Sequence, residues 1–141
     1  MKSLPFSGGI LIRLDRGEEV TAALHGFLEE KRIAAGTITG LGGVRDAELG
    51  FYDLSSRTYD RTTIAGNLEL VTYQGNITVV DGAPFVHAHA VLSGPDYRPY
   101  AGHFFSAVVA ITGEFVLRPA DWSVERLADD ATGLKLMGLP G

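Results

Sequence analysis

Apolar residues recur at helical spacing in residues 18–31. Four of them fall at positions i, i+4, i+7 and i+8, namely Val20, Leu24, Phe27 and Leu28. This spacing places them on one stripe of a helix, which is typical of a helix packed on a core. Acidic residues begin the segment and Lys31 lies at its end, as the helix dipole favours. We therefore predict a helix over residues 18–31, with Gly36 as a stop.

The remainder of the chain has the short apolar runs and turn residues of β-strands. The predicted strands are residues 10–14, 47–52, 59–64, 68–73, 76–80, 85–92, 104–111, 114–117 and 123–126. Turns are predicted at residues 53–56, 65–67, 74–76, 81–82 and 93–96. Asp81-Gly82 is a two-residue hairpin signal. The glycine-rich residues 40–43 do not have dinucleotide-loop spacing, so we interpret them as a turn or bulge.

One early helix followed by many short strands predicts an α+β fold with a mainly antiparallel β-sheet and one principal flanking helix. The 141 residues and 45% hydrophobic content suit one globular domain, residues 1–141. We expect residues 132–141 to be a loose, glycine-rich tail. The N-terminal residues do not resemble a secretion signal, and we find no apolar run that could span a bilayer, so we expect a soluble, cytoplasmic protein without membrane contact.

The formal net charge is −5, and the 12 lysines and arginines are scattered along the chain. This balance makes nucleic acid an unfavourable main partner. The chain has no cysteine, which excludes disulfides and zinc–thiolate sites. Any transition metal must therefore be bound by His, Asp, Glu or water.

Three histidines are the strongest candidates for a functional site. Alternate side chains of a strand share a face, so His87 and His89 lie together, while Ala88 occupies the opposite face. An antiparallel return after the turn at 93–96 places His103 beside them. Three neutral imidazoles suit zinc or another divalent transition metal and leave a fourth coordination position open. On spacing alone, a metal site is no better supported than histidines that are hydrogen-bonded in the core or in a subunit contact.

Other residues indicate chemistry less sharply. Glu69 and Glu114 lie among apolar neighbours. Each is a candidate to hydrogen-bond a metal ligand, to act as a general base or to cap a helix, or it is a solvent-facing strand position. We interpret His25 as a surface or groove-lining residue. The aromatic residues Tyr97, Tyr100, Phe104 and Phe105 wall a pocket or pack in the core. We find no P-loop and no G-x-S-x-G motif, and we assign no catalytic residue.

The order of several segments resembles the PPC (plants and prokaryotes conserved) domain family. The matching segments are RLDRGEE (13–19), ITGLG (38–42), GFY (50–52), LELV (68–71), GNI (75–77), DG (81–82), VHAHA (86–90), AGH (101–103), EFV (114–116), ERL (125–127), Asp129 and TGL (132–134). The resemblance implies an antiparallel sheet with a flanking helix, assembled as a homotrimer. It also implies that His87, His89 and His103 hold a zinc-like metal, as in some prokaryotic members.

Two departures from the family pattern are visible. The family usually has two glycines before the third histidine, whereas Ala101 precedes Gly102 here. This substitution matters only if the first position requires a positive φ. The plant relatives bind DNA through an AT-hook built on Arg-Gly-Arg-Pro, which does not occur in this sequence.

We therefore expect a stand-alone prokaryotic PPC-like domain that binds zinc or another divalent metal through three histidines, with a small-molecule ligand in a pocket. Hydrolytic chemistry is open, and neither substrate nor enzyme class is assigned. The alternatives are a trimeric interaction module and a DNA-associated regulator without an AT-hook. A cupin is a minor alternative, because positions 92–94 after the histidine pair provide no liganding Glu.

Overall fold

A computed structural model describes residues 1–140. In these residues one helix, α1 (Val20–Lys31), accompanies eight strands. The strands are β1 (Lys2–Phe6), β2 (Gly9–Leu14), β3 (Gly36–Asp53), β4 (Thr58–Val80), β5 (Ala83–Ser93), β6 (Pro99–Pro119), β7 (Arg126–Ala128) and β8 (Lys135–Met137). The predicted α+β class with a mainly antiparallel sheet is confirmed.

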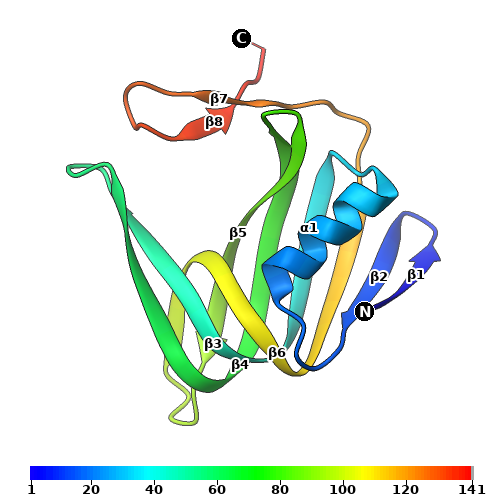
Figure 1. Cartoon of the computed structure of the whole chain (residues 1–141), viewed down its shortest axis with the longest axis vertical. Coiled ribbons are helices and arrows are strands. Elements are labelled where there is room, and N and C mark those ends of the chain that lie inside the picture. Colours follow the sequence, from blue (N-terminus) through cyan, green and yellow to red (C-terminus); the bar gives the residue numbers. More distant parts are fainter. Residues whose placement is uncertain (141) are drawn as a thin grey trace.

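Six strands form one antiparallel sheet in the order β1-β2-β6-β3-β4-β5. The first residues of β6 also pair with β5, so the pairings β6-β3-β4-β5-β6 form a closed ring. Helix α1 packs against β5 and β6. Figure 1 shows β7 and β8 as a small separate hairpin at the end of the molecule where β4 turns into β5.

The predicted helical stripe is confirmed, because Val20, Leu24, Phe27 and Leu28 are the buried residues of α1. The helix begins at Val20 rather than at residue 18, because the Glu19 carboxylate caps it by accepting hydrogen bonds from the backbone N–H groups of residues 21 and 22. Arg32, at φ 56°, ends it in the left-handed conformation. No helix in residues 1–140 is long and apolar enough to cross a membrane.

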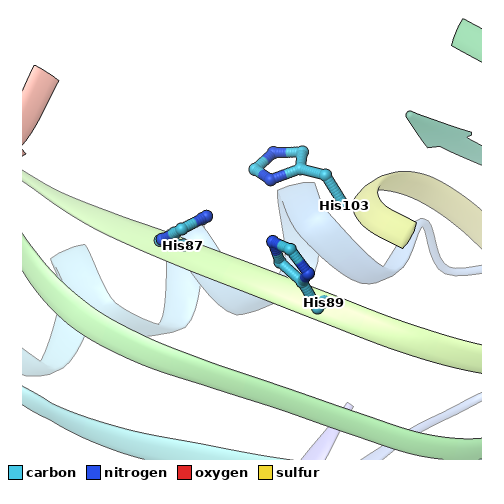
Figure 2. A group of neighbouring side chains, drawn as sticks. All are labelled: His87, His89 and His103. Atoms are coloured by element: carbon cyan, nitrogen blue, oxygen red, sulfur yellow. The ribbon is translucent and has the colours of Figure 1, made fainter. Parts of the chain in front are cut away.

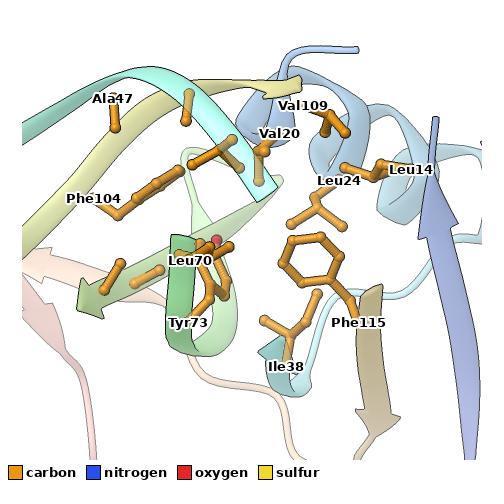
Figure 3. Close-up of a cluster of buried hydrophobic side chains, with 14 of the residues drawn as sticks. Leu14, Val20, Leu24, Ile38, Ala47, Leu70, Tyr73, Phe104, Val109 and Phe115 are labelled. Atoms are coloured by element: carbon orange, nitrogen blue, oxygen red, sulfur yellow. The ribbon is translucent and has the colours of Figure 1, made fainter. Parts of the chain in front are cut away.

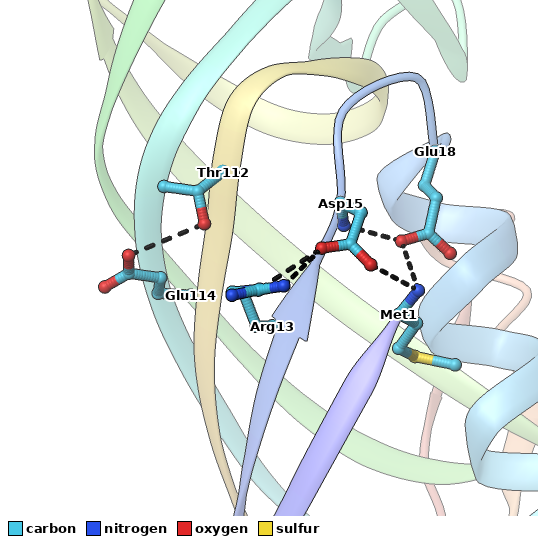
Figure 4. Close-up of polar contacts among 6 residues, drawn as sticks. All are labelled: Met1, Arg13, Asp15, Glu18, Thr112 and Glu114. Atoms are coloured by element: carbon cyan, nitrogen blue, oxygen red, sulfur yellow. Dashed lines mark hydrogen bonds and ion pairs between the residues drawn. The ribbon is translucent and has the colours of Figure 1, made fainter.

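Glu18 lies outside the helix and contacts the chain's N-terminus instead (Figure 4). Its carboxylate accepts a hydrogen bond from the Asp15 backbone N–H at 2.6 Å and pairs with the Met1 ammonium group at 2.8 Å. The Asp15 carboxylate in turn pairs with Met1 at 3.1 Å and Arg13 at 2.8 Å. These contacts attach β1, a strand that the sequence pattern missed, to the start of the helix.

Two predicted turns, at residues 65–67 and 74–76, are wrong. Both segments lie inside the long strand β4, which pairs with β3 along most of its length. The first segment is a bulge opposite Asp46, whose carboxylate accepts a hydrogen bond from the Gly66 N–H. In the second, Gly75 is buried where a Cβ would lie 3.1 Å from the His87 carbonyl oxygen. These glycines bend the strand and bring neighbours close rather than reversing the chain.

The turn at Asp81-Gly82 is confirmed as a two-residue hairpin loop between β4 and β5. Both residues have positive φ, at 50° and 81°, as such loops require. The glycine run at 40–43 is a bulge within β3, where the register with β4 shifts. A side chain at Gly40 would clash with the Phe115 ring, so close packing also requires glycine there.

The core lies between the sheet and α1 (Figure 3). Tyr73, which is 2% exposed, stands edge-to-face against Phe104 at 5.2 Å and Phe115 at 5.3 Å. Among the predicted aromatic wall residues, Phe104 is therefore core and Phe105 is half-buried, whereas Tyr97 is 89% exposed. Tyr100 packs against the core from its edge.

Part of the segment predicted as a tail forms a strand. Residues Lys135–Met137 form β8, which pairs with β7. The Asp129 carboxylate accepts hydrogen bonds from both the N–H and the hydroxyl of Thr132, and the Tyr52 hydroxyl donates to the Thr132 carbonyl. The predicted strand at 123–126 is displaced, because the pairing begins at Arg126. This hairpin forms one rim of the site described below.

Candidate metal centre

Strand pairing brings the three predicted histidines together. His89 and His103 are direct partners in the β5–β6 ladder, and His87 lies two residues along the same strand. The antiparallel return expected after residues 93–96 is confirmed. The loop is shorter than predicted, because β6 begins at Pro99 and the predicted strand began at residue 104. Figure 2 shows the three imidazole rings gathered on one side of β5.

The three rings offer one nitrogen each within 4.8 Å of one another. Their ring centroids lie 5.1 to 5.5 Å apart. His87 and His103 are half-buried and His89 is exposed. Ala88 and Ala90 are buried in the core at 2% and 3% exposure, so the predicted alternation of faces is confirmed. Three neutral imidazoles at this separation could bind a metal ion.

Two glycines let β6 approach β3 at His103. Gly50 is the partner of His103 in the β3–β6 ladder. A Cβ on Gly102 would lie only 2.8 Å from the Gly50 carbonyl oxygen. Ala101 is not among the residues with positive φ, so alanine suits the position where the family usually has glycine.

Aromatic side chains surround His103. The Tyr59 ring lies 4.9 Å from the His103 ring, and the Tyr59 hydroxyl is 3.5 Å from His103 Nδ1. The Phe105 ring is 4.8 Å from the His103 ring. The Arg61 guanidinium stacks over Phe105 at 3.8 Å and pairs with Glu48 at 2.7 Å. These contacts restrict the orientation of the His103 imidazole.

Arg126 contacts His87 from the C-terminal hairpin. Its Nη2 lies 3.2 Å from His87 Nδ1. A guanidinium has only donors, so the Nδ1 atom accepts this hydrogen bond and the proton of the neutral ring is on Nε2. Arg126 also donates to the Thr78 hydroxyl, the Asn76 side-chain oxygen and the Lys135 carbonyl.

Burial favours the neutral form of His87 and His103. Burial is the main cause that lowers the pKa of His103 from 6.5 to about 4, with the nearby His87 and His89 as further causes. Burial also lowers the pKa of His87, and Arg126 and His89 add to this effect. A metal ion needs the lone pair of a neutral imidazole, so these shifts favour coordination at neutral pH.

A cleft of about 350 Å³ opens beside His87 and His103. Its walls are mainly apolar, formed by Val80, Phe85, Val86, Phe104, Phe105, Leu134 and Leu136. His25 lines the same cleft from α1, which confirms its groove-lining position, and its buried Nε2 has no hydrogen-bond partner among residues 1–140. The arrangement can therefore hold a small molecule against the histidine group.

The two predicted glutamates lie elsewhere. Glu69 is exposed in β4 opposite Ser93 and lines a separate groove with Arg16 and Tyr97. Glu114 is exposed opposite Arg13 in β2, and its carboxylate accepts a hydrogen bond from Thr112 (Figure 4). Neither joins the histidine group found in the described part of the chain.

The ring nitrogens instead contact Tyr59 and Arg126, which the sequence analysis did not select. Both residues are distant in sequence from the histidines they contact. Arg126 belongs to the predicted strand at 123–126 and to the ERL segment of the family resemblance, and neither feature indicates a contact with His87.

Comparison with known families agrees with the fold. The sequence model of the Plants and Prokaryotes Conserved (PCC) domain, the family abbreviated PPC above, matches residues 2–121. The chain belongs to this family. The match ends before Arg126, so the PPC family model does not cover the C-terminal hairpin. No curated protein matches the chain.

Solved structures of several prokaryotic proteins are similar over nearly the whole chain. A metal-containing protein from Archaeoglobus fulgidus is 40% identical, with a TM-score of 0.85 over 92% of this chain and 91% of that one. A PPC protein from Pyrococcus horikoshii is 27% identical, with a TM-score of 0.86 over 93% and 91%. A protein from Bacteroides thetaiotaomicron is 26% identical, with a TM-score of 0.93 over 96% and 95%.

The close approach at Gly102 yields a test by substitution. We expect Gly102→Ala to destabilise the protein and to move the start of β6, because the new methyl group would lie 2.8 Å from a backbone oxygen. Chemical denaturation and the NMR signals of His103 would report both effects. Gly26→Ala is the control, since a Cβ on this helical glycine meets nothing within 4 Å. That change should stabilise the helix by about 0.5–1 kcal/mol. An equal free energy of unfolding for Gly102→Ala and Gly26→Ala would contradict the role given to Gly102.

The low pKa of His103 predicts a pH dependence of stability in the metal-free protein. The unfolded chain protonates His103 near 6.5, whereas the folded chain does so only near 4. As pH falls through this window, the unfolded state binds the extra proton, so the free energy of unfolding must fall. Denaturation at several pH values, with chelator present, should show a shallower decline for His103→Gln than for the wild type. If the free energy of unfolding declined equally with falling pH in both proteins, the low pKa assigned to His103 would be refuted.

Proposed function

We propose that this protein binds one zinc ion per chain through His87, His89 and His103. The observation that carries the proposal is the gathering of three imidazoles, each offering a nitrogen within 4.8 Å of the others. Zinc bound tetrahedrally by three imidazoles at 2.0–2.1 Å holds the nitrogens roughly 3.3 Å apart. Small rotations of the side chains therefore suffice for coordination.

The donor set favours a borderline transition metal over the alternatives. No carboxylate belongs to the group in the described residues, which disfavours calcium and magnesium. The chain has no cysteine, so thiolate-bound metals are disfavoured as well. The metal content of the Archaeoglobus fulgidus relative, at 40% identity, supports a metal in this chain too.

Three protein ligands leave one coordination position for water or a ligand, as in catalytic rather than structural zinc sites. A zinc ion there would lower the pKa of bound water and polarise a carbonyl. The chain's own contribution is the cleft beside His87 and His103, whose mainly apolar walls would receive a small molecule. We therefore propose a small-molecule site at this metal and assign no general base.

We also propose that the protein is a homotrimer, as the family resemblance implies. A mainly apolar groove crosses β1, β2, β6 and β3, and the exposed side chains of Leu4, Leu11 and Leu41 line it. These residues are 46 to 63% exposed in the isolated chain. Contiguous apolar surface of this kind marks protein contacts, and a second copy of the chain is its proposed occupant.

A DNA-associated role is the less favoured reading. The relatives from Bacteroides thetaiotaomicron and Ralstonia eutropha are named as candidate DNA-binding proteins. This chain has a net charge of −5, which opposes contact with a phosphate backbone unless basic residues are concentrated on one surface. The metal site is supported by specific geometry, and we therefore prefer it.

Metal analysis tests the central proposal. Protein purified without a nickel column should contain about one equivalent of zinc per chain. The double substitution His87→Ala/His89→Ala should remove it, because one remaining imidazole holds zinc weakly. His25→Ala is the matched control, since this histidine lies outside the group, and it should keep the full metal content. Metal-free wild type, or unchanged metal in the double variant, would refute the site.

Size measurement tests the assembly. Light scattering should give three times the 15.1 kDa mass of one chain. Leu41→Asp should shift the population toward monomer by placing a charge in the apolar groove, whereas Leu54→Asp, at a residue that is 66% exposed in the β3–β4 loop, should not. Repeating the measurement with chelator shows whether the metal stabilises the assembly. A monomeric wild type would refute the trimer.

A further inference from the structure

Arg126 is a buried cation without a carboxylate partner. The residue is 8% exposed, and no ion pair within residues 1–140 includes it. Its acceptors are two neutral side chains, one backbone carbonyl and the His87 ring. A buried charge is costly unless it is paired, so this guanidinium favours an anion beside it.

The hydrogen bonds of Arg126 do not use all of its donors. A guanidinium has five N–H donors. Nε donates to Thr78, Nη1 to the Lys135 carbonyl, and Nη2 to both Asn76 and His87. Within residues 1–140, one N–H on Nη1 therefore has no acceptor, and the bond to His87 is the contact with a candidate metal ligand.

Coordination of His87 to a metal is incompatible with its hydrogen bond from Arg126. If the metal is bound through Nδ1, the lone pair that accepts the bond is consumed. If it is bound through Nε2, the neutral ring carries its proton on Nδ1, which then becomes a donor. In either case Arg126 loses this acceptor and has one free N–H on each Nη atom. Donors on both Nη atoms can hold the two oxygens of a carboxylate.

The charges around the cleft favour the same ligand. Its lining residues include Arg126 and Lys135 but no Asp or Glu. Lys135 is already paired with Asp81 at 2.6 Å, so Arg126 is the cation whose charge is unbalanced. The adjoining walls are apolar, with the Phe85 ring 5.5 Å from the guanidinium carbon and Leu134 and Leu136 on the hairpin. A singly charged head on an apolar body fits this combination.

We propose that Arg126 anchors a small carboxylate ligand with a short apolar body, and that this ligand and the metal bind cooperatively. The inference rests on the proposed metal site. Without the carboxylate, metal binding removes the hydrogen bond from the buried guanidinium to His87 and leaves that donor without an acceptor. When the carboxylate is bound, the guanidinium gains a charged partner. Such coupling is reciprocal, so the carboxylate strengthens metal binding by the same factor as the metal strengthens carboxylate binding.

The test measures zinc affinity in a metal buffer that fixes free zinc, with sodium butyrate as the probe. Sodium chloride at equal ionic strength and neutral butyramide are the reference additives. We expect the dissociation constant for zinc to fall by about fivefold or more in butyrate and to be unchanged in butyramide. The reverse titration, butyrate into metal-free and zinc-loaded protein, should give the same factor.

Substitutions test whether Arg126 is responsible for the effect of butyrate on zinc affinity. Arg126→Lys keeps the charge and removes the paired donors, so most of the butyrate effect should be lost. Arg98→Lys is the matched control on an arginine whose side chain is 82% exposed, and it should respond like the wild type. If Arg126→Lys does not fold, the comparison of butyrate with chloride in the wild type decides the question alone.

The outcomes separate this inference from the metal site itself. Equal zinc affinity in butyrate and chloride overturns the carboxylate site and leaves the metal site standing. A full butyrate effect in Arg126→Lys overturns the role of Arg126. A larger effect from inorganic phosphate than from butyrate overturns the carboxylate class. Absence of zinc binding under all conditions overturns both proposals.

Discussion

The pairing of β5 with the first residues of β6 is the constraint on which the site depends. This short ladder closes the ring of strands and makes His89 and His103 direct neighbours. It requires close approach of β6 to β3, which glycine at positions 50 and 102 permits. The alternation of β5 then buries Ala88 and Ala90 against the core and leaves the histidines on the other face. Core packing therefore fixes the strand that carries two of the three imidazoles.

The site combines neutral donors with one buried charge. Burial lowers the pKa of both His87 and His103, so they offer lone pairs rather than protons at neutral pH. Arg126 is held beside them by Thr78, Asn76 and the β7–β8 hairpin, although a cation opposes the approach of a metal ion. An anion bound beside Arg126 would balance that charge. Such an anion would explain why a cation lies next to the proposed metal site.

Local patterns predicted several elements because local physics decides them. The buried stripe of α1 follows from 3.6-residue periodicity, and the Asp81-Gly82 loop from the backbone angles that tight hairpins need. The same rules failed at residues 65–67 and 74–76, where glycine serves a bulge and a close approach within a long strand. The sequence alone does not distinguish a glycine in a turn from a glycine that allows a neighbouring strand to approach closely.

The sequence alone identified the three histidines, the shared face of His87 and His89, and the α+β class, because residue type and strand alternation are local properties. It did not determine their surroundings. Glu69 and Glu114 were plausible partners from their apolar neighbours, yet the fold places them on other surfaces. Tyr59 and Arg126 contact the rings because sheet closure and the C-terminal hairpin bring distant segments together. Only the tertiary structure decides such contacts, since they depend on strand register and packing rather than on spacing along the chain.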